Sequence, residues 1–168
     1  MLQSKLNNIY NEAVEMILEA GIPLDPWKIE RVELNTRAKR RWGQCRYLPN
    51  GNYEININAE LVRQSKEGAL NTIIHELLHA SKDGGGHNGK WKEYANIINN
   101  TYNINVKRTN SAEEKGITEP IIKETDYKYI LECKQCNYKY KRMRRSNFVN
   151  YYEDYTCGRC GGRIKRIK

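Results

Sequence analysis

Two histidines four residues apart, with a glutamate directly after the first, lie near the middle of the chain at His75, Glu76 and His79. On a helix, residues at this spacing share one face with about 5–6 Å between their Cβ atoms, so both imidazoles can bind one metal ion. Glu76 faces the same site, where its carboxylate can accept a proton from a metal-bound water. His87 follows Gly84-Gly85-Gly86, a stretch that lets the backbone turn sharply, and is the predicted third ligand. The pattern predicts a metal centre with a general base beside it.

The alternative is an ordinary amphipathic helix in which Ile74, Leu77 and Leu78 face a core and two histidines share a face by coincidence. Two observations count against it. The chain contains only three histidines, and all of them lie in this stretch. The flanking residues also make the helix apolar almost all round, which is typical of a buried helix, and buried histidines need partners. The metal-binding interpretation is therefore favoured.

A second set of metal-ligand residues lies near the C-terminus, where Cys133 and Cys136 are followed, after twenty residues, by Cys157 and Cys160. Two Cys-x2-Cys pairs at this separation are the ligand arrangement of a zinc ribbon. Asn137, beside the first pair, tolerates the left-handed backbone that a tight knuckle needs. A four-thiolate site is closed, so this zinc is expected to be structural and to hold together about 40 residues that cannot build an adequate core.

Two disulfides are the alternative pairing of these cysteines. Residues 1–5 do not open a signal peptide, because the apolar positions that follow alternate with Asn and Glu. No run approaches the ~20 apolar residues of a membrane helix. We therefore expect a cytoplasmic protein with no membrane partner, and in that compartment cysteines bind metal more often than they form disulfides.

Positive charge is concentrated in the C-terminal part of the chain. Residues 121–168 carry 13 Lys/Arg against 5 Asp/Glu, a net charge of +8 out of +9 for all 168 residues. Such a concentration predicts a polyanionic partner, most often nucleic acid. The alternative is a solvated basic tail that keeps the protein soluble.

The expected nucleic-acid contacts are the cations between and after the cysteine pairs: Lys139, Lys141, Arg142, Arg144, Arg145, Arg163, Lys165 and Arg166. Seven tyrosines are interleaved with them: Tyr127, Tyr129, Tyr138, Tyr140, Tyr151, Tyr152 and Tyr155. Tyrosines that stack on bases, beside cations that neutralise phosphates, hold single strands without sequence preference. Several of these tyrosines are also expected to fill the thin core of the ribbon, so none is assigned individually.

Hydrophobic periodicity predicts an α+β fold with helices packed on a small three-stranded antiparallel sheet. The expected elements are, in order, helix 2–20, strands 28–34, 38–47 and 53–58, and helices 67–80 and 89–102. A hairpin turn is expected at 49–52, which reads Pro-Asn-Gly-Asn.

Residues 103–125 are poor in large apolar side chains, which indicates a linker or a loosely packed connection with the domain boundary inside. We place a first domain at 1–105, a linker at 106–125 and a basic four-cysteine ribbon at 126–168. The remaining cysteine, Cys45, would need an activating histidine to act as a nucleophile, and none remains once the metal is bound. We interpret it as a small buried residue of a strand.

These motifs together resemble the SprT-like metalloprotease family, which includes the Spartan proteases that degrade proteins crosslinked to DNA. The resemblance rests on Arg41-Trp42-Gly43-Gln44-Cys45, on His75-Glu76-Leu77-Leu78-His79, on Gly86-His87 and on the four-cysteine ribbon. It covers residues 1–102 and 127–168. The gap from the second to the third histidine is longer than in metzincins and agrees with the SprT-like arrangement. Gln44 departs from the serine that SprT-like sequences commonly have there.

The resemblance implies a zincin-like fold for the first domain. It also implies two zinc ions, a catalytic one in this domain and a structural one in the ribbon. His75, His79 and His87 would hold the catalytic ion and leave one position for water, and Glu76 would accept the water's proton during peptide hydrolysis. DNA-bound or DNA-crosslinked proteins are the implied substrates, with a substrate strand added to the sheet edge. The basic ribbon would recruit the enzyme to DNA, and single-stranded DNA is one form that it could bind.

Two other functions stay open on the sequence alone. A non-catalytic nucleic-acid-binding protein with two structural zinc ions explains the charge and the ribbon equally well, although a structural site needs no base between its ligands. A zinc hydrolase of small molecules is the other alternative. A deep closed pocket would favour it, whereas an open groove along a strand favours a protein substrate.

Overall fold

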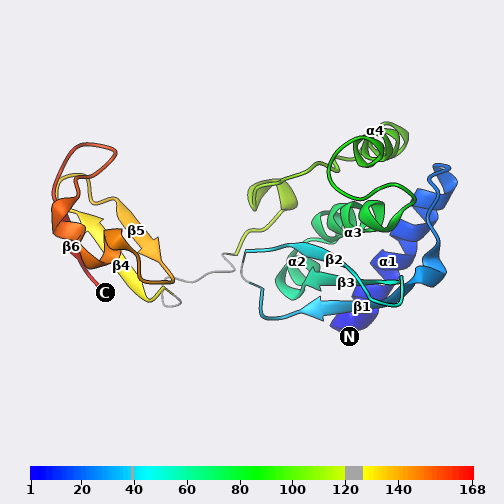
Figure 1. Cartoon of the computed structure of the whole chain (residues 1–168), viewed down its shortest axis with the longest axis horizontal. Coiled ribbons are helices and arrows are strands. Elements are labelled where there is room, and N and C mark those ends of the chain that lie inside the picture. Colours follow the sequence, from blue (N-terminus) through cyan, green and yellow to red (C-terminus); the bar gives the residue numbers. More distant parts are fainter. Residues whose placement is uncertain (39, 120–126) are drawn as a thin grey trace. The chain divides into compact units, whose positions relative to one another are not determined.

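The computed structural model describes residues 1–38, 40–119 and 127–168 (Figure 1). The chain divides into two compact units, Met1–Ile121 and Ile122–Lys168. Among the described residues, none of the helices has the length and hydrophobicity of a membrane-spanning segment.

Unit 1 has the mixed α+β composition expected from its sequence. Its elements are α1 (Leu2–Glu19), the 3-10 helix η1 (Pro26–Lys28), β1 (Ile29–Asn35), β2 (Gly43–Tyr47), β3 (Tyr53–Asn58), α2 (Ala59–Gln64), α3 (Lys66–Ala80), α4 (Lys90–Tyr102) and the 3-10 helix η2 (Glu113–Lys115). Most predicted ends agree with these to within one residue. The exception is the strand predicted at 38–47, which begins only at Gly43; Lys39, within that prediction, lies outside the described residues.

The residues before β2 are held by a side chain rather than by a strand ladder. The Asn58 side-chain amide donates to the carbonyl oxygens of Ala38 and Arg41, at 2.7 and 3.3 Å. The Asn58 backbone N–H donates to the Trp42 carbonyl at 2.8 Å. These bonds close the chain into a loop ahead of β2, which is why the strand is shorter than the sequence predicted.

The sheet of unit 1 has the strand order β1-β3-β2 and is mixed, not antiparallel as predicted. The hairpin was predicted correctly, since β2 pairs antiparallel with β3 and Gly51 in the turn has φ +87°. β1, however, pairs in parallel with β3. The last strand is inserted between the first two, so β1 has no direct pairing with its neighbour in sequence. Alternating hydrophobicity shows which face of a strand is buried, but not the direction of its partner.

The two faces of the sheet differ in polarity. Ile55 and Ile57 of β3 are fully buried in the core beneath the helices. Glu54, the residue directly before Ile55, points to the opposite face. There it forms ion pairs with Arg31 of β1 at 2.9 Å and with Arg46 of β2 at 2.8 Å, so this carboxylate links all three strands. β1 and β2 are the two edge strands of this sheet.

Helix α3 lies at the centre of unit 1, packed against α1, α4 and the sheet (Figure 1). The Ser65 hydroxyl caps it by accepting a hydrogen bond from the Gly68 N–H. Its apolar residues are buried in the core: Ala69, Leu70, Ile73, Ile74, Leu77 and Leu78. Beyond its exposed first turn the helix is therefore buried, as its nearly all-round hydrophobicity predicted, and its polar residues Thr72 and Glu76 are buried as well.

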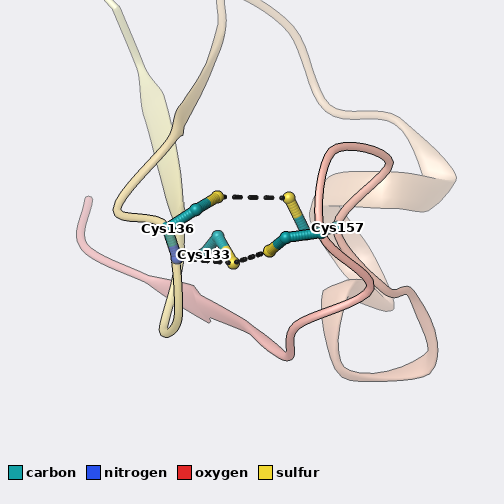
Figure 2. A group of neighbouring side chains, drawn as sticks. Cys133, Cys136 and Cys157 are labelled. Atoms are coloured by element: carbon teal, nitrogen blue, oxygen red, sulfur yellow. Dashed lines mark hydrogen bonds between the residues drawn. The ribbon is translucent and has the colours of Figure 1, made fainter.

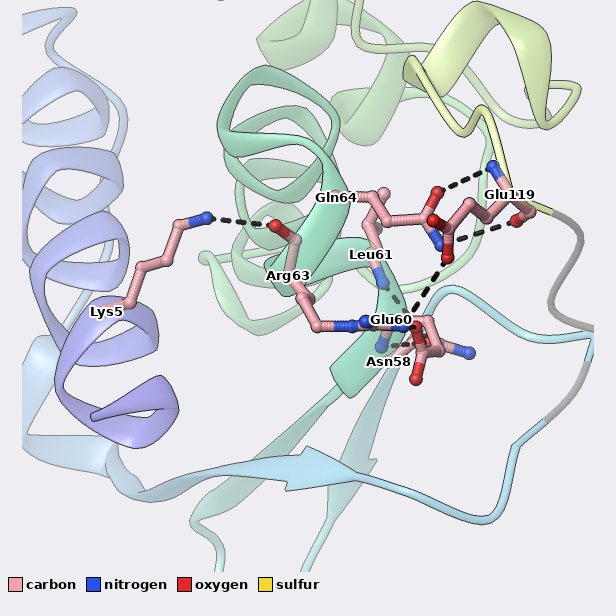
Figure 3. A network of polar contacts seen from close by, with 7 residues as sticks. All are labelled: Lys5, Asn58, Glu60, Leu61, Arg63, Gln64 and Glu119. Atoms are coloured by element: carbon pink, nitrogen blue, oxygen red, sulfur yellow. Dashed lines mark hydrogen bonds and ion pairs between the residues drawn. The ribbon is translucent and has the colours of Figure 1, made fainter.

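Residues 106–119 pack on unit 1, which corrects the prediction that they belong to a linker. Val106 is only 2 % exposed and Lys115 only 7 %. The Glu119 backbone exchanges two hydrogen bonds with the Gln64 side chain, at 3.0 and 3.3 Å (Figure 3). The low apolar content of this segment did not indicate that it packs, because many of its contacts are made by polar side chains and by the main chain. The rest of the predicted linker lies outside the described residues.

Unit 2 is a small three-stranded antiparallel sheet in the order β5-β4-β6. Its elements are β4 (Tyr129–Cys133), β5 (Lys139–Arg142), the short helix α5 (Asn147–Asn150), the 3-10 helix η4 (Tyr152–Asp154) and β6 (Ile164–Arg166). Its buried core contains Leu131, Cys133, Val149, Cys157 and Ile164. We still expect a bound metal ion to stabilise this module, because so small a core contributes little burial.

Candidate metal centres

The three histidines converge on one point in unit 1. His75 and His79 project from α3, and His87 comes from the connection between α3 and α4. Their Nε2 atoms are 2.9 Å (His75–His87), 3.2 Å (His79–His87) and 3.3 Å (His75–His79) apart. A tetrahedral ion with Zn–N bonds of about 2.0–2.1 Å separates two ligand nitrogens by about 3.3 Å. The residues therefore fit a single metal ion.

Contacts from outside the motif orient the rings. The His75 Nδ1 donates to the Lys107 carbonyl at 3.1 Å, and the His79 Nδ1 donates to the Gly85 carbonyl, which leaves both Nε2 atoms free for a metal. Trp91 packs against all three imidazoles, with ring centroids 4.8–5.7 Å apart. The sequence analysis did not identify either contact, that of Trp91 or that of the Lys107 carbonyl.

The turn that brings His87 back depends on a glycine at a close approach. A Cβ at Gly84 would collide with the Leu78 carbonyl oxygen at the end of α3. Gly85, the next residue, has φ +36°, which side-chain-bearing residues rarely adopt. The glycine-rich turn predicted from the sequence is thus required by contact with the helix that carries the other two ligands.

The imidazoles are poised to be neutral ligands. Burial, together with the charges of the nearby His79 and His87, lowers the pKa of His75 to about 3. Burial also lowers the pKa of His79 and of His87. A neutral imidazole keeps a lone pair for a metal, so these shifts favour metal binding near neutral pH.

Glu76 is buried beside this centre and does not point into bulk solvent. Only 7 % of it is exposed, and its carboxylate accepts a hydrogen bond from the Cys45 backbone N–H. Burial raises the pKa of Glu76 to about 7. The carboxylate fits only because residue 43 is glycine: a Cβ at Gly43 would lie 2.5 Å from Glu76 Oε1 and 2.8 Å from Glu76 Cγ.

A cleft of about 650 Å³ exposes the centre along strand β2. Its lining includes the three histidines, Glu76 and a pair of tyrosines, Tyr47 and Tyr53, whose rings meet edge to face at 5.3 Å. Cys45 also lines the cleft. Burial raises the pKa of its thiol to about 12, so it is not a thiolate nucleophile at neutral pH. Cys45 lies in a strand as predicted, but it is only partly buried.

The four predicted ribbon cysteines gather in unit 2. Sulfur–sulfur distances are 3.4 Å for Cys133–Cys160 and 3.6 Å for Cys136–Cys157. Figure 2 shows the sulfur atoms of Cys133, Cys136 and Cys157 turned toward a common centre. A tetrahedral ion with Zn–S bonds of about 2.3 Å separates two sulfurs by about 3.8 Å, so these residues also fit one ion. Asn137 has φ +55°, the left-handed conformation expected at this knuckle.

One side chain outside the sequence motif supports this cluster. The Tyr140 hydroxyl lies 3.1 Å from Cys157 Sγ and accepts a hydrogen bond from the Gly158 N–H at 3.2 Å. The hydrogen bond from Tyr140 lowers the pKa of the Cys157 thiol and so favours the thiolate that binds a metal.

The eight predicted nucleic-acid cations all lie on unit 2. All are exposed except Lys141, which is half-buried. Lys165 forms an ion pair with Glu132 at 2.9 Å, and Arg142 and Arg166 lie over aromatic rings. The tyrosines divide as expected: Tyr129, Tyr140 and Tyr152 pack on the core, whereas Tyr138, Tyr151 and Tyr155 are exposed.

The fold and these clusters define a metal-binding α+β protein with a four-cysteine module. The SprT-like family model matches residues 7–110, and the chain belongs to this family. Protein SprT-like from Oceanobacillus iheyensis is 31 % identical over 143 residues, which is 83 % of each chain. Protein SprT-like from Lactiplantibacillus plantarum is 29 % identical over 142 residues, covering 82 % of this chain and 84 % of that protein. Germ cell nuclear acidic-1 protein from Caenorhabditis elegans is 28 % identical over 170 residues, covering 96 % of this chain but 29 % of that protein.

Proposed function

We propose that the chain is a zinc-dependent endopeptidase of the SprT-like type that acts on DNA-bound or DNA-crosslinked proteins. The observation that carries the proposal is the convergence of three imidazole Nε2 atoms, 2.9–3.3 Å apart, with a buried glutamate directly after the first of them. A zincin-like fold for unit 1 is part of the same proposal.

His75, His79 and His87 would hold the catalytic ion, and Cys133, Cys136, Cys157 and Cys160 a structural one. Zinc suits both donor sets, because it binds imidazole nitrogen and cysteine sulfur in tetrahedral geometry. Three protein ligands leave a position open for chemistry, whereas four thiolates do not. When bound by the histidines, zinc would polarise a peptide carbonyl and increase the acidity of water.

Glu76 is the proposed proton carrier. It would accept the proton of the attacking water and deliver it to the leaving amine. Burial raises the pKa of Glu76 to about 7, which suits both accepting the proton and delivering it near neutral pH. The Cys45 N–H holds the carboxylate in place, and Gly43 leaves the space that it occupies.

The cleft supports a protein rather than a small molecule as substrate. It is an open groove beside β2, one of the two edge strands of the sheet. An extended substrate segment can add to such an edge through main-chain hydrogen bonds. A small-molecule hydrolase, by contrast, would be expected to enclose its substrate.

Unit 2 supports a nucleic-acid partner. Exposed cations and exposed tyrosines lie on the same module, and the Arg159 guanidinium group lies over the exposed Tyr138 ring, 4.3 Å from its centroid. Its Lys and Arg side chains would neutralise phosphates, and Tyr138, Tyr151 or Tyr155 would stack on bases of a single strand. Binding there would concentrate the peptidase on proteins attached to DNA.

A non-catalytic nucleic-acid-binding protein is the second candidate, favoured by the exposed cations of unit 2. It does not account for Glu76, whose buried carboxylate beside the ligands has no use in a purely structural site. A metal centre with a fourth protein ligand in place of an open position would favour this candidate.

The test is cleavage of a protein bound to single-stranded DNA by the full chain and by Glu76→Gln. We expect kcat/KM to fall by about 10²–10⁴-fold in the variant, with unchanged zinc content, because a general base is lost but no ligand is. Glu67→Gln, an exposed residue in the first turn of the same helix, is the matched control. Cleavage by Glu76→Gln at the wild-type rate would remove Glu76 from the mechanism, and no cleavage by the zinc-loaded wild type would favour the non-catalytic alternative.

A further inference from the structure

A second cavity, of about 350 Å³, lies directly beside the metal-binding cleft. The two share three lining residues, Gly43, His75 and Glu76. Residues 40–42 contribute to one side of the second cavity, and residues 107–110 with Lys115 contribute to another. An extended chain spans about 3.3–3.6 Å per residue. If the reacting carbonyl of a substrate lies at the metal centre, the side chain of a residue one or two positions away can therefore reach this cavity.

The second cavity is strongly basic, and we call it the basic pocket. Five cations line it: Arg40, Arg41, Lys107, Arg108 and Lys115. Among its described lining residues, Glu76 is the only carboxylate. The metal-binding cleft differs sharply, since its described lining contains no lysine or arginine and includes Asp83. Positive charge is therefore confined to one side of the metal centre.

Two of these cations are engaged with the protein. Lys107 forms an ion pair with Glu114, and the Lys115 ammonium donates a hydrogen bond to Thr72 Oγ1 at 2.6 Å. The three arginines differ, because in the described part of the chain no carboxylate forms an ion pair with any of their guanidinium groups. The basic pocket thus holds cations that the fold itself does not neutralise.

The chemistry of the pocket fits a carboxylate. A guanidinium group presents a planar fork of donors that matches the two oxygens of a carboxylate. A single nucleic-acid strand instead needs successive exposed aromatic rings beside a stripe of cations. The only aromatic residue in the described lining is Trp42, which is half-buried, and the exposed tyrosines with nearby cations are on unit 2. A single acidic side chain is the better occupant.

We propose that the basic pocket selects substrates by binding the carboxylate of an Asp or Glu side chain one or two residues from the scissile bond, on one side of it only. Arg41 and Arg108, from opposite sides of the pocket, are the specificity-determining residues. This inference rests on the proposed peptidase function, because it assigns a preference to the same cleft.

The test uses the full zinc-loaded chain and a quenched fluorescent peptide that it cleaves. Matched peptides carry Glu or Gln at each of the two positions on either side of the scissile bond. We expect the Glu/Gln ratio of kcat/KM to be about tenfold or more at a position on one side and near one on the other, because a charge-assisted hydrogen bond is replaced by a neutral one. The ratio should fall toward one in Arg41→Gln and Arg108→Gln. It should keep its value in Arg37→Gln, an exposed arginine of the same loop that does not line the pocket.

A wild-type ratio near one at every position, or a preference that survives in the Arg41→Gln/Arg108→Gln double variant, would overturn the proposal. If no peptide is cleaved, the proposed function fails and the pocket is tested by fluorescence anisotropy of the labelled Glu and Gln peptides. Tighter binding of the Glu peptide that disappears in the double variant would support the pocket, and equal binding would overturn it. A single-stranded oligonucleotide that loses affinity in the double variant, while the peptide ratio stays unchanged, would assign the pocket to nucleic acid instead.

Discussion

Replacing Gly43 by alanine should separate catalysis from metal binding. The new Cβ would lie 2.5 Å from Glu76 Oε1, and 2.8 Å from both Glu76 Cγ and Thr72 Cγ2. Ordinary van der Waals contact begins at 3.4 Å, so the carboxylate must retreat by about 0.9 Å, the difference between 3.4 and 2.5 Å. A misplacement of about 1 Å in a catalytic group costs about 10²-fold in rate, or about 2.7 kcal/mol. The crowding should also destabilise unit 1 by about 1–3 kcal/mol.

The assay is kcat/KM for protein cleavage by Gly43→Ala, together with the zinc content of the purified variant. We expect activity near 1 % of wild type with both zinc ions retained, because the three atoms nearest to the new methyl group belong to Glu76 and Thr72 and not to a histidine. Gly86→Ala is the matched control: it also lies beside the metal centre, but its Cβ would meet no atom within 4 Å and its φ is not positive. Wild-type activity in a fully zinc-loaded Gly43→Ala would refute the argument, as would loss of the histidine-bound zinc.

Three further predictions concern other parts of the chain. Lys115→Met should change how the free energy of unfolding depends on pH. Burial lowers the pKa of Lys115 in the native state to about 8, below the value of about 10.4 in the unfolded state. The wild type should therefore gain stability relative to the variant as pH rises from 7 to 10, by at most about 3 kcal/mol. Denaturant unfolding of both proteins at the two pH values measures this, and a constant difference would contradict it. Cys45→Ala should retain cleavage within about threefold, because Glu76 is held by the backbone N–H and not by the thiol; a loss of 10²-fold or more would restore the thiol as a candidate catalytic group. Tyr140→Phe should weaken zinc binding at the ribbon by about 10-fold, through loss of the hydrogen bond to Cys157, as measured by competition with a chelator; an unchanged affinity would show that the hydroxyl has no such role.

Both metal clusters could be predicted because their signals are local. The four-residue spacing of His75 and His79 fixes two side chains on one face of a helix, whatever the rest of the fold does. The paired cysteines lie on tight knuckles for a similar reason, and Asn137 takes the left-handed conformation that its side chain allows. The hairpin between β2 and β3 was equally local, since its turn residues are adjacent in sequence.

Features that depend on distant parts of the chain could not be obtained in this way. The parallel pairing of β1 with β3 follows from the insertion of one strand between two others, and no pattern within β1 encodes it. Low apolar content suggested that residues 106–119 were a linker, yet this segment supplies Lys115 to the interior and the Lys107 carbonyl to a ligand histidine. The sequence showed Gly43 only as part of a family motif. Its role in leaving space for Glu76 could not be predicted, because Glu76 lies on another element.

Zinc content of the purified full chain is the measurement that tests the central claim most directly. Two zinc ions per chain are expected for the wild type, and one for His79→Ala, because the ribbon cysteines do not depend on that imidazole. Two zinc ions retained in His79→Ala, or a single zinc ion in the wild type, would contradict the claim that three histidines hold the catalytic ion.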